Sequence, residues 1–125
     1  MPGQGEDDVV LTVPARVEFG DVARRAAGEL ARRQGFDNRR WAELETAVDQ
    51  TLRLLRGGRG ERIRFRFVAG GTAIAVEAEL TDGDGTPRRL CRTAIEDLRS
   101  TLAPLVDGTE VDGGAGLVRF VSRAS

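Results

Sequence analysis

The sequence predicts one α/β domain: a two-layer sandwich with three helices on one face of a mixed, mostly antiparallel sheet, in the order β-α-α-β-β-α-β-β. Three segments carry a single apolar stripe at helical spacing, so each has one face to bury. Other segments alternate apolar and polar residues with a period of two, which is typical of strands with one buried face. A chain of 125 residues with 40% hydrophobic composition suits a single core.

The first strand is expected at 9–13, where Pro14 ends it. A helix is expected to follow over 18–34, with Gly35 as its C-terminal stop. Its apolar stripe is formed by Phe19, Val22, Ala23, Ala26 and Leu30. A second helix is predicted over 39–56. Its stripe is formed by Trp41, Leu44, Val48, Leu52 and Leu55, and Asp37 or Asn38 is its N-cap.

Residues 61–80 predict a β-hairpin, because Ile and Phe alternate with Arg before Gly70-Gly71 and apolar residues alternate with Glu after it. A two-residue loop at these glycines would place Arg64 opposite Glu77. The same register pairs Arg62 with Glu79, Phe65 with Val76, and Phe67 with Ile74.

The remaining elements are a loop over 81–87, a third helix over 88–105, and two short strands over 109–111 and 117–121. The stripe of the third helix consists of Cys91, Ala94, Ile95, Leu98, Leu102 and Leu105. Cys91 is therefore interpreted as a core residue.

The composition excludes several classes of chemistry. The chain has no His and no Lys, so a Ser-His-Asp or Cys-His site, a P-loop lysine and a Schiff base are all excluded. A single Cys without His leaves no usual zinc site. No apolar run is long enough for a membrane span, and the acidic N-terminus does not resemble a secretory signal. We expect a cytoplasmic protein with a disordered tail over 1–7 and one domain over 8–125.

The 19 positive charges are all Arg, but 20 acidic residues accompany them and the net charge is −1. The Arg pairs of the first two predicted helices are interleaved with Asp and Glu at helical spacing, which is typical of solvated helix faces. A phosphate-binding surface needs clustered, unpaired cations. Nucleic acid is therefore not an expected partner.

The element order, the opening LTVPARVEF and the stretch AVDQTL in the second helix resemble the anti-sigma-factor serine kinases. These belong to the GHKL superfamily of ATP-binding domains, which also contains the histidine-kinase ATPase domain. The resemblance spans about 11–121 and implies the Bergerat-like ATPase fold. It also implies protein partners, namely a sigma factor or its STAS-domain antagonist, and it is compatible with a homodimer.

In that family the second helix carries a Glu that orients or activates the attacking group, then an Asn that ligates Mg²⁺, and then a His. The matching positions in this chain are Gln50, Leu54 and Gly58. Gln cannot accept a proton in the useful pH range, and Leu offers no oxygen to Mg²⁺. A second interpretation stays open, in which Leu54 simply widens the core stripe of the helix.

The family's next motif is D-x-G-x-G, whose Asp binds adenine. In this chain Asp82, Gly83 and Gly85 follow the third strand, but the glycines stand at different offsets from the motif. They are therefore weak cofactor-binding candidates. The alternative is that this stretch is a flexible turn. The stretch from Arg88 has no glycine, whereas the family has a Gly-rich lid there. With all three motifs altered, we expect no catalytic residues, no metal site and no cofactor, so ATP and Mg²⁺ are not expected ligands.

The expected function is that of a catalytically silent relative of these kinases, which regulates transcription by binding a protein. Two alternatives remain: a divergent ATP-binding serine kinase, and a dimerisation or scaffold domain unrelated to sigma factors.

Overall fold

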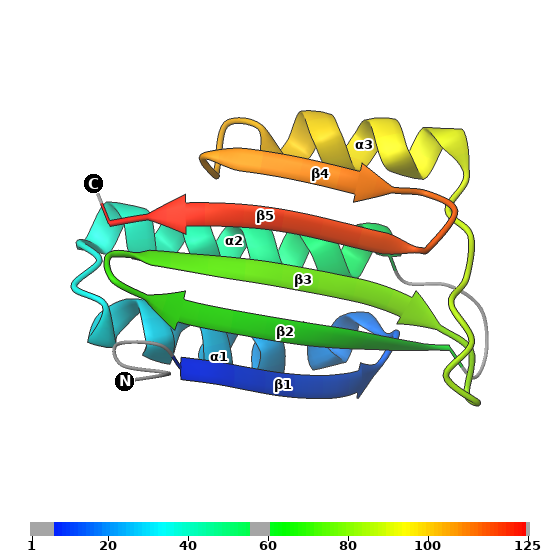
Figure 1. Cartoon of the computed structure of the whole chain (residues 1–125), viewed down its shortest axis with the longest axis horizontal. Helices are drawn as coiled ribbons and strands as arrows, with labels where there is room; N and C mark the ends of the chain where they lie inside the picture. Colours follow the sequence, from blue (N-terminus) through cyan, green and yellow to red (C-terminus); the bar gives the residue numbers. More distant parts are fainter. Residues whose placement is uncertain (1–6, 56–60, 125) are drawn as a thin grey trace.

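Five strands form one sheet, and three helices cover one of its faces in the computed structural model of the chain, which describes residues 7–55 and 61–124 (Figure 1). The elements are β1 (Asp7–Pro14), α1 (Gly20–Arg33), α2 (Asn38–Leu55), β2 (Arg62–Gly70), β3 (Ala73–Thr81), α3 (Arg92–Leu102), β4 (Gly108–Asp112) and β5 (Leu117–Arg123). A short 3-10 helix, η1 (Val17–Phe19), precedes α1. The α/β class with three helices is confirmed.

The strand order in the sheet is β1-β2-β3-β5-β4, and each neighbouring pair is antiparallel. The prediction of a mixed sheet was therefore wrong for the strands described. A tight hairpin makes its two strands antiparallel, as in β2–β3 and β4–β5. β1 pairs with β2, and β5 pairs with β3, in antiparallel orientation as well.

The β2–β3 hairpin differs from the predicted register by two residues. Gly70 pairs with Ala73, so the loop is Gly71-Thr72, and Arg64 lies opposite Glu79 rather than Glu77. Gly71 has a φ of 59°, and a positive φ at the first loop position is the pattern of a type II′ turn, which favours Gly there. A shift of two residues leaves every side chain on its predicted face.

The predicted third helix was too long at both ends. The backbone N–H of Arg88 donates to Leu80 O and that of Leu90 donates to Gly113 O, both at 2.8 Å, so the chain is held extended before α3 begins. Cys91 is exposed, and its Sγ accepts the Ala94 backbone N–H at 3.5 Å as an N-cap. The interpretation of Cys91 as a core residue was wrong.

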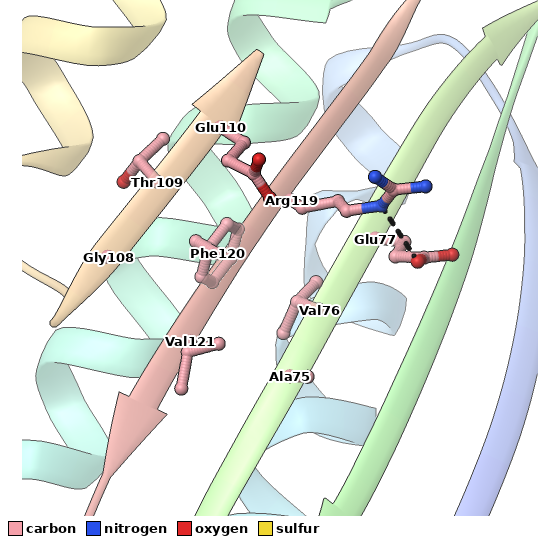
Figure 2. A pocket seen from close by; sticks show the side chains of 9 residues that line it. All are labelled: Ala75, Val76, Glu77, Gly108, Thr109, Glu110, Arg119, Phe120 and Val121. Atoms are coloured by element: carbon pink, nitrogen blue, oxygen red, sulfur yellow. Dashed lines mark hydrogen bonds and ion pairs between the residues drawn. The ribbon is translucent and has the colours of Figure 1, made fainter. Parts of the chain in front are cut away.

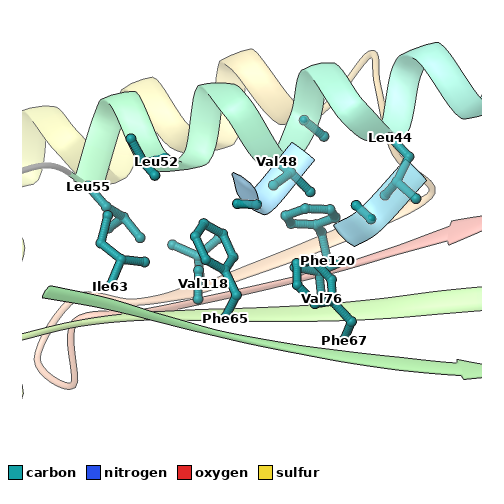
Figure 3. Close-up of a cluster of buried hydrophobic side chains, with 14 of the residues drawn as sticks. Leu44, Val48, Leu52, Leu55, Ile63, Phe65, Phe67, Val76, Val118 and Phe120 are labelled. Atoms are coloured by element: carbon teal, nitrogen blue, oxygen red, sulfur yellow. The ribbon is translucent and has the colours of Figure 1, made fainter. Parts of the chain in front are cut away.

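The core lies between the helices and the inner face of the sheet (Figure 3). Alternate residues of β2 and β3 point inward and are fully buried there. The rings of Phe65 and Phe67 stack with centroids 5.8 Å apart. The stripe of α2 lies directly above them, through Leu44, Val48, Leu52 and Leu55.

The buried side of α1 is rotated from its predicted stripe. Val22 is 46% exposed, whereas Ala27 and Ala31 are fully buried. Small residues on this side bring α1 close to α2. A Cβ on Gly28 would lie 2.6 Å from Trp41 Nε1, so a larger residue at that crossing would have to displace the indole. The interleaved acids do pair with the Arg residues of these helices, as in Arg32–Glu29 at 2.6 Å.

The N-terminal end of α2 is fastened to β5. The Asp37 carboxylate accepts the backbone N–H of Arg40 at 2.8 Å, which makes Asp37 the N-cap. The Arg40 guanidinium then donates to Asp107 Oδ2 at 2.6 Å, to Arg123 O at 2.9 Å and to the buried Ser122 Oγ at 3.2 Å. Because Arg40 is largely buried, these hydrogen bonds set the position of the helix on the sheet.

No described helix is both long enough and apolar enough to cross a membrane. β1 begins at Asp7, one residue inside the predicted tail, and residues 1–6 lie outside the described part of the chain.

Candidate functional site

The predicted site residues gather at one end of the molecule. The C-terminal end of α2, the loop after β3 and the start of α3 all lie at the end where β2 begins and β3 ends (Figure 1). Gln50 and Leu54 lie on α2, and Asp82 lies in the loop. Gly58, the third degenerate position, lies outside the described residues.

Gln50 and Leu54 are both half-buried, one helical turn apart. Leu54 packs against the edge of the hydrophobic core. This environment agrees with the second interpretation, in which Leu54 widens the core stripe of the helix. Among the described residues, no hydrogen bond is formed by the Gln50 side chain. An amide and an aliphatic side chain at these positions offer neither a base nor an oxygen pair for a metal ion.

The loop after β3 is a closed turn. The Gly85 N–H donates to Asp82 O at 2.9 Å, and the Asp82 N–H donates to Thr86 O at 2.8 Å. Thr81 and Pro87 then form a bridge between the two arms of the loop. Gly83 and Gly85 are exposed in this turn. A turn at these glycines was the alternative to a cofactor-binding motif.

Asp84 stabilises the same turn. Its Oδ1 accepts the Thr86 backbone N–H at 3.0 Å, and this hydrogen bond lowers the pKa of the Asp84 carboxyl below its ordinary value of 3.8. The carboxylate therefore stays charged under ordinary conditions and holds the loop closed.

The Asp82 carboxylate belongs to a three-residue cluster that sequence reasoning missed. Arg88 donates to Asp82 Oδ1 from Nη1 and lies against Glu61 Oε2 through Nε, both at 3.0 Å. Glu61 is buried, and its Oε1 has no hydrogen-bond partner among the described groups. Arg88 was predicted at the start of the third helix. Its extended backbone, set by hydrogen bonds to β3, instead places it between two carboxylates.

These contacts limit what the predicted site can do. Arg88 occupies one carboxylate oxygen of Asp82, and no hydrogen bond joins Asp82 to Gln50 or Leu54 within the described residues. No group of three His, Cys, Asp or Glu side chains in residues 7–55 and 61–124 is arranged to hold a metal ion. The residues lie toward the same end of the molecule, but the contacts they make are structural.

A second candidate site lies on the outer face of the sheet, away from the helices. A hollow of about 390 Å³ opens over β3, β5 and β4 (Figure 2). Its floor includes Ala75, Val121 and Gly108, which lie side by side in the sheet register. Glu77 and Arg119, joined at 3.0 Å, lie beside this floor. The alternation in the hairpin placed Glu77 on the polar face of its strand, but sequence reasoning assigned no face to residues 108–121 and could not show a concave surface.

The chain matches no known protein-family model, and it matches none of the curated proteins with which it was compared.

Proposed function

We propose that the chain is a catalytically silent relative of the anti-sigma-factor serine kinases, with a Bergerat-like fold, that regulates transcription by binding a protein partner. The expected partner is a sigma factor or a STAS-domain antagonist, and such a regulator acts in the cytoplasm. The support comes from the sequence resemblance along 11–121 together with the chemistry of three positions in the fold.

The observation that carries the proposal is the environment of Leu54. At the position where the kinase family has a Mg²⁺-ligating Asn, this chain has an aliphatic residue packed against the core. Gln50 precedes it by one turn, in place of a Glu that could act as a base. Phosphoryl transfer depends on a metal ion that neutralises charge and positions the phosphates. A chain without the family's Asn and Glu therefore lacks a ligand for that metal and a base for the attacking group.

Asp82 supports the same proposal. A nucleotide that used the Asp82 carboxylate would have to displace or share the hydrogen bond from Arg88 at 3.0 Å. Displacing Arg88 would also leave the buried Glu61 without its ionic partner, because Arg88 pairs with both carboxylates. Such an uncompensated buried charge is costly, which opposes nucleotide binding at this position.

Two measurements test the proposal. Calorimetry with Mg-ATP at millimolar concentration should give almost no heat, and mixing with purified sigma factors and STAS-domain proteins of the same cell should give a stable complex without nucleotide. A micromolar dissociation constant for Mg-ATP, or a complex that forms only with ATP, would contradict the proposal and favour the divergent kinase.

A double variant sharpens the first measurement. Gln50→Glu together with Leu54→Asn restores the family's two residues on α2 but leaves the Asp82 loop and the extended Arg88 segment unchanged. We expect this variant to show no saturable ATP hydrolysis, because positioning depends on all of these elements. Recovered hydrolysis would show that only the metal site had been lost.

A further inference from the structure

β1 lies at one edge of the sheet, and its hydrogen bonds to β2 determine which of its backbone groups face solvent (Figure 1). The Ala15 backbone N–H donates to Glu61 O at 3.0 Å, just beyond the last residue pair between the two strands. In an antiparallel pair, every second residue directs both its N–H and its C=O toward the neighbouring strand. Ala15 is such a residue, so the odd-numbered residues of β1 bond to β2. The backbone N–H and C=O groups that point away from the sheet are therefore those of Asp8, Val10 and Thr12.

The other side of β2 gives the same alternation. Gly70 pairs with Ala73 across a two-residue loop, which makes them a hydrogen-bonded pair. The even-numbered residues of β2 therefore bond to β3, and its odd-numbered residues bond to β1. Pro14 occupies an even position of β1, where proline is tolerated because the missing N–H would face solvent. The Pro14 C=O accepts the Arg16 N–H at 2.8 Å, so the open edge of β1 ends at Thr12.

Exposed apolar side chains lie along this open edge. The large apolar side chains that are exposed in the described part of the chain are those of Val9, Val10 and Val22, at 37%, 50% and 46%. Val10 lies on the outer face of β1, and Val9 lies on the inner face, where the core of the sheet ends. An edge strand with apolar side chains on both faces is a template for pairing with another strand.

α1 extends this apolar surface below the edge. Gly28 of α1 faces Trp41 of α2, and Val22 lies about 120° around the helix from Gly28, on the side away from α2. Because α2 covers the middle of the sheet, this side of α1 faces the β1 edge (Figure 1). Phe19 and Ala26, about one turn before and after Val22, are half-buried against the core. We call Val9, Phe19, Val22 and Ala26 the apolar shelf.

Two Arg residues on the outer face of β2 have no acidic partner among the described residues. Arg62 and Arg64 are exposed, and no ion pair engages either of them in that part of the chain. Glu79 lies opposite Arg64 on β3, but no ion pair joins the two. On the other side, the β1 residues opposite Arg62 and Arg64 are Pro14 and Thr12, which are short. The Arg64 side chain can therefore extend over Thr12 toward the open edge.

The opposite edge strand is protected in ways that β1 is not. β4 has five residues, it directs Glu110 and Asp112 outward, and α3 packs against it. Short edge strands, charged side chains and a covering helix are common means of preventing pairing at a sheet edge. β1 has eight residues, and its outward carboxylate, Asp8, is already paired with Arg66 at 2.8 Å. The edge of β1 is therefore the one that is open to a further strand.

We propose that the open edge of β1 binds an extended segment of another protein as a sixth strand of the sheet. The backbone of this segment bonds to the outward N–H and C=O groups of Val10 and Thr12. Its aliphatic side chains, at alternate positions, rest on the apolar shelf. On its other side an acidic residue lies beside Thr12 and pairs with Arg64. In strand addition of this kind, backbone hydrogen bonds supply affinity and the alternate side chains select the segment.

Amide hydrogen exchange measured by NMR tests the proposal. The probe is a soluble peptide of about eight residues in which Val alternates with Glu. In the chain alone, the amides of Val10 and Thr12 should exchange rapidly, and those of Val9 and Leu11 should exchange slowly. The peptide at about 1 mM should slow exchange at Val10 and Thr12 at least roughly tenfold.

Two results of this experiment overturn the proposal. One is the absence of any protection of Val10 and Thr12 by the peptide. The other is protection of these amides in the chain without peptide, because the edge would then already be covered by a second copy or by another segment of the same chain.

Val10→Pro tests the role of the edge backbone. It removes an N–H that faces solvent, so the chain should fold normally by circular dichroism but should lose the peptide. Val10→Thr keeps the N–H at the same position and should retain binding. A Val10→Pro protein that folds and still binds the peptide contradicts the proposal.

Arg64→Glu tests the acidic position of the segment. The wild-type chain should bind the Glu peptide at least roughly fivefold more tightly than a matched peptide with Lys in place of Glu, and Arg64→Glu should reverse this preference. Arg25→Glu makes the same charge change at an exposed position of α1 and should leave the preference unchanged. A preference that is the same in the wild type and in Arg64→Glu overturns the assigned chemistry of the partner. None of these experiments involves nucleotide or a sigma factor, so their outcome is separate from that of the proposed function.

Discussion

The two faces of the sheet are made by the same strands but are organised by different interactions. On the inner face, Phe65 and Phe67 alternate with outward Arg residues and are fully buried beneath α2 (Figure 3). On the outer face, Arg66 pairs with Asp8 of β1 at 2.8 Å and Arg119 pairs with Glu77 of β3 at 3.0 Å. The inner face depends on apolar area and close packing, and the outer face depends on which charges stand opposite each other.

This difference determines where the fold is sensitive to substitution. Removing a buried side chain loses transfer free energy and leaves a cavity, whereas removing an exposed ion pair changes stability by only about 0–1 kcal/mol. We therefore expect substitutions on the inner face to change stability much more than substitutions on the outer face. The following predictions can break or sharpen that division.

The largest effect is expected for Phe67→Ala. Phe67 is fully buried and stacks on Phe65, so the free energy of unfolding should fall by about 3–5 kcal/mol. Val68→Ala, the next residue on the same strand but on the outer face, should cost less than about 1 kcal/mol. Urea unfolding of the two variants measures this difference, and equal costs would contradict the division between the faces.

Arg40→Ala should cost about 2–3 kcal/mol, because it leaves the buried Ser122 hydroxyl without its donor and removes the ionic partner of the Asp107 carboxylate, which keeps only the backbone N–H of Arg123. The control is Arg39→Ala. The Arg39 side chain is 85% exposed and lies 3.6 Å from Glu43, so its loss should cost no more than about 0.5 kcal/mol. Thermal unfolding distinguishes the two, and a small effect at both positions would show that the Arg40 hydrogen bonds do not fasten α2.

Leu54→Asn should cost about 1–2 kcal/mol, since Leu54 packs against the core and the new amide would be left partly unsatisfied there. Leu54→Met preserves the volume and should cost little. Chemical denaturation in the presence and absence of Mg-ATP measures both quantities. Stabilisation of the Asn variant by Mg-ATP would indicate a working metal site.

The smallest effect is expected from acid. The Arg66 guanidinium hydrogen-bonds the Asp8 carboxylate and holds the pKa of that carboxyl below its ordinary value of 3.8. A group with a lowered folded pKa stabilises the fold above its unfolded pKa, and this stabilisation is lost as the pH falls through the folded value. The wild-type melting temperature should therefore approach that of Asp8→Asn below pH 3.8. A difference that instead grew with acidification would contradict this sign.

The sequence predicted the faces of the elements better than their contacts. The alternation in β2 and β3 placed each side chain on the correct face, but the register was wrong by two residues, because such a shift keeps every side chain on its face. The hydrophobic pattern is the same in both registers. The observed register places Gly71 at the loop position that needs a positive φ. In α1, Val22 had the stronger hydrophobic signal, but the small residues Ala27 and Ala31 were buried because they allow close approach to α2.

The candidate site shows the same limit. Gln50 and Leu54 fall on one side of α2 because helical periodicity puts residues four apart together. The partners of Asp82 could not be predicted in the same way. Arg88 reaches Asp82 and Glu61 only because a backbone hydrogen bond to Leu80 holds its segment extended, where local propensity favoured a helix.

The sequence by itself determined which residue types are absent, which segments form regular elements, and which side of each strand is apolar. These properties follow from composition and from local periodicity, which tertiary contacts rarely reverse. Only the tertiary structure decided the strand register, the start of α3, the exposure of Cys91 and the Arg88 cluster. Each of these depends on hydrogen bonds or packing between residues far apart in the chain, whose relative positions no local pattern contains.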